Sequence, residues 1–145
     1  MYLIDQGVSI DAEYYCGLMK EMIPEMTALS DGDFTFQQDG ACAHTAKHTL
    51  AYFAEHLPST ASLLQPEEWP PCSPDLNPMD YAIWGEMGRL VYNVKIRDLN
   101  HLADRIGDVW AELEQDVIDK AIDVFIKRVK ACIEANGGHF EYLLK

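Results

Sequence analysis

The sequence predicts an α/β fold in which about three short strands with flanking helices precede an all-helical C-terminal tail. Two observations support this fold class. Residues 34–39 alternate so that Phe34 and Phe36 share one face, which is typical of a half-buried strand. Beyond residue 78, apolar residues recur every three or four positions, which is the spacing of one helix face. Strands interleaved with helices, followed by helices alone, indicate an α/β domain with a helical extension.

The first part of the chain is predicted to hold a strand end and a helix. Residues 1–5 form a short strand or its tail, and this abrupt beginning suggests that the chain starts inside a domain. Residues 11–29 form a helix with Asp11 and Glu13 in its first turn, where the positive end of the helix dipole favours acids. Pro24 is expected to kink or end this helix.

Two further strands are predicted, one on each side of a second helix. The strand 34–39 ends at Asp39, and Gly40 permits a sharp turn. Thr45 then caps a helix with an apolar stripe, and residues 61–65 form the third strand. The stripe consists of Leu50, Phe53 and Leu57.

A third helix is predicted to follow a proline-rich loop at residues 66–78, since prolines exclude a central strand or a helix interior. Asn77 is the expected N-cap and Pro78 the first helical residue. Asp80 is then the third residue of this helix. Its continuing apolar face consists of Ile83, Met87, Leu90 and Val91.

The tail is predicted to form two more helices. Asp98 caps the first, and Gly137-Gly138 ends the second. Each carries apolar residues at helical spacing. These are Leu99, Leu102, Ile106, Val109 and Leu113 in the first helix, and Ile118, Ile122, Phe125, Val129 and Ile133 in the second.

The charge distribution argues against a stand-alone nucleic-acid binder. The formal net charge is −13, and residues 1–88 hold two basic and 14 acidic side chains. Nucleic-acid binders carry a basic footprint, so DNA affinity would have to come from another part of a longer protein. The four cysteines form no Cys-x-x-Cys pair, so neither a zinc knuckle nor a redox motif is predicted. No uncharged apolar run approaches the roughly 20 residues of a membrane span, so no membrane association is expected.

Two aspartates are the candidate metal ligands. Asp39 ends a predicted strand, and ligands gather at the carboxyl ends of strands in open α/β sheets. Asp80 lies in the first turn of a predicted helix, where free amide groups favour the ionised carboxylate. Oxygen ligands of this kind suit Mg²⁺ or Mn²⁺. Taken alone, the spacing favours Asp80 as a helix-capping acid and Asp39 as a turn-forming residue before Gly40.

Two sequence blocks resemble the second and third acidic motifs of mariner-like transposases. They are FQQDGACAHTA at residues 36–46 and WPPCSPDLNPMDYAIW at residues 69–84. The segments GVSIDAEYY (7–15) and KRVKACIEANGGHFEYL (127–143) are also similar to parts of that family, so the resemblance runs the whole length.

The resemblance implies a truncated RNase H-like fold. Residues 1–92 would form a partial catalytic core, and residues 93–145 the C-terminal helical segment of the same domain. Asp39 and Asp80 would be two of the three carboxylates that hold a pair of Mg²⁺ or Mn²⁺ ions for phosphoryl transfer on DNA. The partner would be DNA, bound through a missing N-terminal region, and the location would be nuclear.

The chain departs from the family pattern in ways that bear on activity. The family's first aspartate would precede residue 1, and Asp5 is not expected to take its role. Cys42 stands where the family commonly has a proline. The strand that bears the second acid would lack its central neighbour and expose an edge. We therefore expect the isolated chain to be inactive, and to be marginally stable, to rearrange its sheet or to form a homo-oligomer.

Several interpretations stay open at this point. His44 either has a functional place, near the scissile phosphate or in the outer shell of the site, or bonds to backbone at a helix entry. The whole chain is either a transposase fragment or a non-catalytic, domesticated interaction module. A third reading is an unrelated metal-dependent hydrolase that uses Asp39, Asp80 and another acid such as Glu68.

Overall fold

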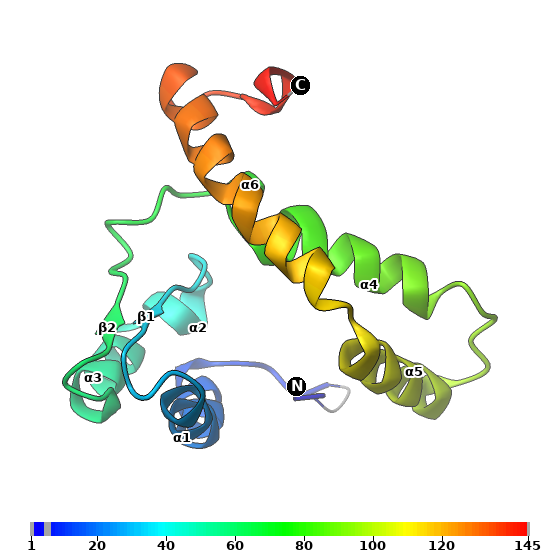
Figure 1. The fold of residues 1–145 in the computed structure, drawn as a ribbon. Helices are drawn as coiled ribbons and strands as arrows, with labels where there is room; N and C mark the ends of the chain where they lie inside the picture. The colour runs from blue at the N-terminus through cyan, green and yellow to red at the C-terminus, as the bar shows by residue number, and fades with distance from the viewer. Residues whose placement is uncertain (1, 5–6, 145) are drawn as a thin grey trace. The chain divides into compact units, whose positions relative to one another are not determined.

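The computed structural model describes residues 2–4 and 7–144. The chain forms two compact units: Ile4–Cys72, and Ser73–Lys145 together with Met1–Leu3. Figure 1 shows the helices and strands of each unit. The boundary expected between residues 92 and 93 separates a partial catalytic core from the C-terminal helical segment of the same domain. It stays a prediction.

Helix α1 (Ala12–Leu29) begins where the sequence predicts. The Asp11 carboxylate accepts a hydrogen bond from the Tyr14 amide at 2.9 Å, which is an N-cap contact. Pro24 does not end the helix, because α1 continues to Leu29, and the alternative expectation of a kink stays a prediction. Its buried face, formed by Tyr15, Cys16, Met19 and Ile23, packs on the unit's core and holds the helix through the proline.

The sheet is a parallel pair, β1 (Thr35–Phe36) and β2 (Ser62–Leu63), in which Thr35 lies opposite Ser62. Both strands lie inside the predicted segments, but β1 ends at Phe36 rather than at Asp39. The Ser62 and Leu64 amides donate to the Phe34 and Phe36 carbonyls, both at 2.9 Å. Alternate amides of a strand face the same neighbour, so the next donor toward β1 would come from Pro66, which has no amide proton. The ladder therefore stops at this proline.

The strand expected at residues 1–5 is absent from residues 2–4, so that prediction was wrong for them; residues 1 and 5 lie outside the described part. A strand exists only as part of a ladder. In the described part of the chain the sheet consists of β1 and β2. The Leu3 side chain is 56% exposed, so residue 3 gains little from burial either.

The segment after β1 forms two short helices, α2 (Cys42–Thr45) and α3 (Lys47–His56). The predicted cap at Thr45 was wrong, because Ala46 is extended and precedes α3 with no side-chain cap. Thr45 is the last residue of α2, and its hydroxyl donates to the Ala41 carbonyl at 3.2 Å. The fully buried Phe53 of α3 packs with Tyr15, Met19 and Ile23 in the core of this unit.

The other unit opens with the predicted loop and helix start. A single 3₁₀ turn, Pro74–Leu76, interrupts the irregular segment before Asn77. The Asn77 side-chain oxygen accepts from the Met79 amide at 3.1 Å, and Pro78 is the first helical residue. Asp80 is therefore the third residue of the helical run, as predicted. The run begins as a π-helical turn (η2, Met79–Ile83) and continues as α4 (Trp84–Val91).

The tail forms helices α5 (Leu99–Glu112) and α6 (Gln115–Glu134), followed by a 3₁₀ turn, η3 (Glu141–Leu143). Asp98 caps α5 by accepting from the His101 amide at 2.8 Å, which confirms that prediction. After α6, Gly137 adopts a positive φ of 76° and its amide donates to the Cys132 carbonyl, so the predicted stop at the glycines is confirmed. The core joins residues of η2, α4, α5 and α6: Ile83, Met87, Val91, Val109 and Ala121.

The apolar face predicted for α6 was partly wrong. Ile122 and Ile133 are 58% and 71% exposed, whereas Ala121 and Ala131 are buried. A small residue at position 121 lets the Tyr81 hydroxyl reach the Ala121 carbonyl, to which it donates at 2.7 Å. The helix is thus oriented by a polar contact as well as by its largest apolar side chains.

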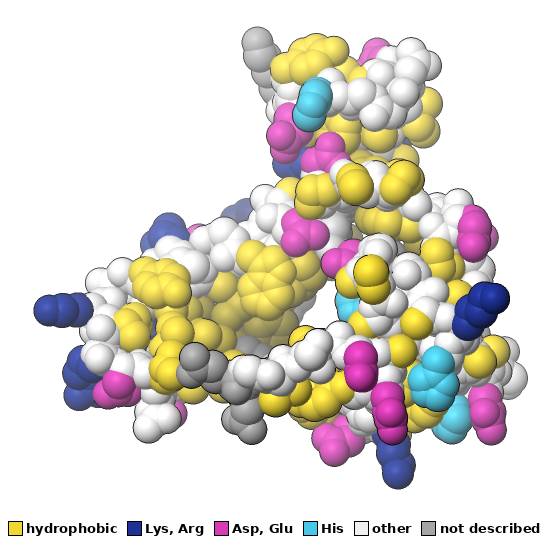
Figure 2. Space-filling model, turned by 180° about the vertical axis from the view of Figure 1, so that it is seen from behind, with side chains coloured by type: hydrophobic (Ala, Val, Ile, Leu, Met, Phe, Trp, Pro, Cys, Tyr) yellow, Lys and Arg dark blue, Asp and Glu magenta, His cyan; other side chains and the backbone are white. Residues whose placement is uncertain are grey.

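Exposed apolar side chains are frequent. Figure 2 shows hydrophobic side chains spread over much of the face it presents, with acidic groups among them. Leu29, Leu99 and Ile133 are each more than two-thirds exposed. Among the described residues, none of the helices is both long enough and apolar enough to cross a bilayer.

Replacing Asn77 with alanine is expected to destabilise the helix that carries Asp80. The substitution removes the acceptor for the Met79 amide, and the loss of such a cap costs about 1 kcal/mol. Urea unfolding followed by circular dichroism measures this cost, with Asn77→Asp as the matched control that keeps a capping oxygen. An Asn77→Ala variant as stable as the wild type would contradict the role of this cap.

Candidate metal-binding site

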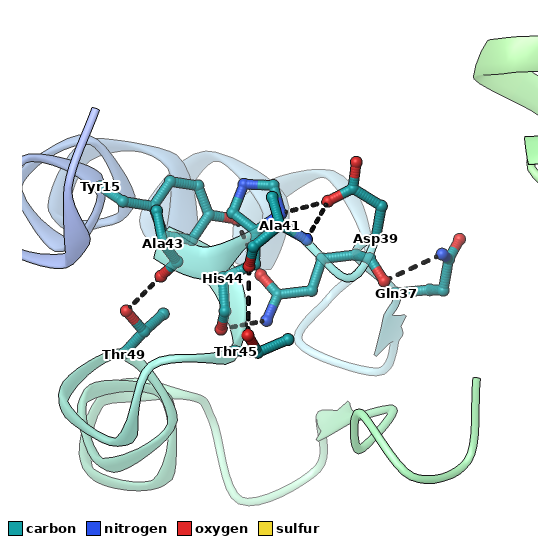
Figure 3. Close-up of polar contacts among 9 residues, drawn as sticks. Tyr15, Gln37, Asp39, Ala41, Ala43, His44, Thr45 and Thr49 are labelled. Carbon is teal, nitrogen blue, oxygen red and sulfur yellow. Dashed lines mark hydrogen bonds and ion pairs between the residues drawn. The ribbon is translucent and has the colours of Figure 1, made fainter. Parts of the chain in front are cut away.

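Asp39 lies in the turn between β1 and α2, and its carboxylate is held from one side. Its Oδ1 atom accepts a hydrogen bond from the Ala41 amide at 3.0 Å and lies 2.6 Å from His44 Nδ1. Both contacts appear as dashed lines in Figure 3, where the other carboxylate oxygen has none. The Asp39 side chain is 57% exposed. The structure thus gives the Asp-Gly turn that the sequence allowed, and leaves one oxygen available.

His44 lies on α2, packed between Asp39 and the helix α1. Its ring lies against that of Tyr15, with 4.3 Å between ring centroids, and its side chain is 24% exposed. The Tyr15 hydroxyl donates to Gln38 Oε1 at 2.9 Å, and Gln38 Nε2 donates to the His44 carbonyl at 3.0 Å. The His44 side chain thus contacts the Asp39 carboxylate, and its place in a metal site stays a prediction.

Sequence reasoning missed Tyr15 and Gln38. Tyr15 lies 24 residues before Asp39, on a different predicted helix. Gln38 was placed inside the predicted strand 34–39, with no role of its own. No local pattern joins these residues to the motif at 36–46. Only the packing of α1 against α2 and α3 brings them together.

The Tyr15 phenol is held in its neutral form. Burial raises its pKa from the ordinary 10.0 to about 12, and the negative charges of Asp39 and then Cys16 add to this shift. A neutral phenol keeps its proton and can donate to Gln38, whereas a phenolate could only accept. The contact between Tyr15 and Gln38 therefore persists through the physiological pH range.

Alkaline pH is expected to destabilise the unit Ile4–Cys72 through Tyr15. The folded pKa lies above the unfolded value, so this contribution to stability is complete below pH 10 and is lost as the pH rises through about 12. Denaturant unfolding at a series of alkaline pH values measures the loss. Tyr15→Phe is expected to flatten this dependence and Tyr14→Phe, on the exposed side of α1, to leave it unchanged. An equal slope in wild type and Tyr15→Phe would contradict the prediction.

Asp80 lies in the first helical turn of the other unit. Its amide donates to the Asn77 carbonyl at 2.9 Å, and its side chain is exposed. Within the described residues, its carboxylate has no hydrogen bond or ion pair. The nearby cation Arg128 is occupied elsewhere: it lies 4.0 Å above the Tyr81 ring and donates to the Asp75 carbonyl at 2.8 Å. The negative charge of the Asp80 carboxylate is therefore not neutralised by Arg128.

The donor groups at both aspartates fit a hard divalent cation. Each is an exposed carboxylate with at least one free oxygen, and Mg²⁺ is commonly bound by one or two carboxylates while it keeps several waters. Among the described residues, no group of three His, Cys, Asp or Glu side chains is placed to hold a metal ion. Asp39 and Asp80 belong to different compact units, and their convergence on one cation stays a prediction.

Glu68 and several other acids and histidines have contacts within their own segments. Glu68 accepts from the Gln65 amide within its own loop, at 2.7 Å. Asp75 lies in the 3₁₀ turn before Asn77. His56 lies 2.9 Å from the Tyr52 carbonyl, and His101 lies 3.2 Å from the Arg97 amide. None of these adds a ligand beside Asp39.

The structure matches solved transposase catalytic domains. The catalytic domain of Mos1 mariner transposase matches with a TM-score of 0.82 at 18% identity, over 96% of this chain and 68% of that one. The Mos1 mariner paired-end complex with Mn matches with the same score, over 40% of its chain. The fold class is therefore that of part of an RNase H-like transposase catalytic domain, mostly helical with a small parallel sheet.

Sequence relatives identify the family. The Tcb2 transposase of Caenorhabditis briggsae is 35% identical over 109 residues, and the Tc1 transposase of Caenorhabditis elegans is 32% identical over the same length. The chain is thus homologous to the Tc1/mariner transposases. It spans 37% of the length of both of these relatives. No protein-family model matches it.

Proposed function

We propose that this chain is part of the catalytic domain of a cut-and-paste DNA transposase, in which Asp39 and Asp80 are two of three metal-binding carboxylates. One observation carries the proposal: the homology to Tc1/mariner transposases. A match over 109 of 145 residues must include residues 37–109, and therefore both aspartates. Exposed carboxylate oxygens at both positions agree with this role.

The chemistry of the proposed reaction is in-line displacement at phosphorus. Bound Mg²⁺ or Mn²⁺ ions would activate the attacking oxygen and neutralise charge on the leaving oxygen. The chain's own contribution is to hold carboxylates: Asp39 through the turn after β1, and Asp80 through the capped first turn before α4. Both carboxylates would act as ionised oxygen ligands of the metal, and neither forms a covalent intermediate.

The partners and location proposed for the chain follow from the same homology. The partner is DNA, bound through a region outside these residues, because residues 1–88 carry only two basic side chains. The site of action is the nucleus. The isolated chain is inactive, because a two-metal site needs a further carboxylate. Its exposed apolar surface favours self-association.

Comparing the chain with a longer version of itself tests this function. We expect the 145 residues alone to leave supercoiled DNA intact, and the product of the extended upstream reading frame to nick and join it with Mg²⁺. Asp39→Asn or Asp80→Asn in the longer protein is expected to abolish both steps. Nicking that survives both substitutions would contradict the proposal. Nicking by the 145 residues alone, lost in Asp80→Ala, would instead favour an unrelated metal-dependent hydrolase.

A further inference from the structure

The contacts around Asp39 distinguish its two carboxylate oxygens. Oδ1 accepts from the Ala41 amide and lies 2.6 Å from His44 Nδ1. Oδ2 has no hydrogen-bonding partner among the described residues. An ionised carboxylate only accepts hydrogen bonds, so the proton in the contact with His44 belongs to Nδ1. Two hydrogen-bond donors thus contact Oδ1, and none of the described residues donates to Oδ2.

The orientation of His44 is itself fixed from a different helix. The Tyr15 ring packs on the imidazole, and the Tyr15 hydroxyl holds Gln38, whose amide in turn donates to the His44 carbonyl. Tyr15 is only 8% exposed, so α1 holds it firmly in the core. The result is a continuous set of contacts from a buried helix to one oxygen of an exposed carboxylate.

We propose that Tyr15 and His44 are positioning residues that fix Oδ1 of Asp39, so that the carboxylate binds a divalent cation through Oδ2 alone. The inference rests on the proposed function for the identity of the ligand, and adds how that ligand is oriented. Groups that orient a metal ligand by hydrogen bonding typically change metal affinity about 10–100-fold when removed. Tyr15 acts at a distance, through the ring it packs on and through Gln38.

A metal-free measurement tests the positioning directly. In ¹⁵N NMR spectra of the imidazole of the 145-residue chain near neutral pH, we expect His44 to carry its proton on Nδ1. Asp39→Asn and Tyr15→Phe are both expected to shift this signal, and Tyr14→Phe to leave it in place. A His44 ring with an unprotonated Nδ1, or a signal unaffected by Asp39→Asn, would overturn the inference whether or not Asp39 binds metal.

Mn²⁺ titration of the same variants tests the consequence for the ligand. We expect His44→Ala to weaken Mn²⁺ binding by about tenfold or more. His44→Asn supplies an amide donor in place of Nδ1 and is expected to restore most of the affinity. Tyr15→Phe is expected to add little to His44→Ala, because both act through the same oxygen. Wild-type affinity in His44→Ala, with binding lost in Asp39→Asn, would overturn the inference and leave the proposed function intact. Unchanged affinity in Asp39→Asn would instead remove Asp39 as a ligand, and with it the proposed function.

Discussion

Replacing Phe53 with alanine is expected to unfold the unit Ile4–Cys72. Phe53 is fully buried, with its ring 5.3 Å from that of Phe36 and 6.5 Å from that of Tyr15. It therefore joins α3 to both β1 and α1. Removing a buried phenylalanine costs about 3–5 kcal/mol, against total stabilities of about 5–15 kcal/mol. A unit with only a two-stranded sheet has little stability to lose.

The measurement is urea unfolding followed by far-ultraviolet circular dichroism. Leu29→Ala is the control, because Leu29 is 89% exposed at the end of α1 in the same unit. It is expected to change stability by less than about 0.5 kcal/mol. A Phe53→Ala variant that loses less than about 1 kcal/mol would show that this unit is not held by the cluster around Phe53.

Mn²⁺ binding is expected to disappear in Asp39→Asn and in Asp80→Asn alike. Each substitution keeps the size of the side chain but removes its charge. If the two residues share one cation site, the loss of either should exceed the roughly 10–100-fold that outer groups such as His44 contribute. Isothermal titration of the 145-residue chain measures it.

The control for this second prediction is Asp75→Asn. Asp75 lies in the same loop as Asp80 but in a 3₁₀ turn, where its backbone carbonyl, not its carboxylate, accepts from Arg128. We expect this variant to bind Mn²⁺ as the wild type does. Binding that is lost in Asp39→Asn but retained in Asp80→Asn would contradict a shared site.

Features set by neighbouring residues could be predicted from the sequence. The caps at Asn77 and Asp98 were predicted, because a capping side chain bonds an amide two or three residues away. The position of Asp80 as the third helical residue follows from the same local rule. Asp80 therefore has the local setting that its motif indicated, whereas Asp39 lies in a turn beyond the end of β1.

Features set by distant partners could not be predicted in this way. The end of β1 depends on its partner segment, because the next amide that would face β1 belongs to Pro66, which has no amide proton. The predicted strand at residues 1–5 requires a neighbour that its own sequence cannot supply. The π-helical turn at Met79–Ile83 accompanies the Tyr81 contact with Ala121, which lies 40 residues away. The contact of the Tyr15 ring with His44 likewise depends on packing between helices.

The most direct test of the central claim is the pattern of amide signals that Mn²⁺ broadens in NMR spectra of the 145-residue chain. Paramagnetic broadening detects weak binding, and each amide reports its own distance from the ion. If Asp39 and Asp80 share a cation site, amides around both residues should lose intensity together at the same low Mn²⁺ concentration. Broadening around only one aspartate, or around neither, would contradict the assignment of this pair as the metal ligands of a transposase site.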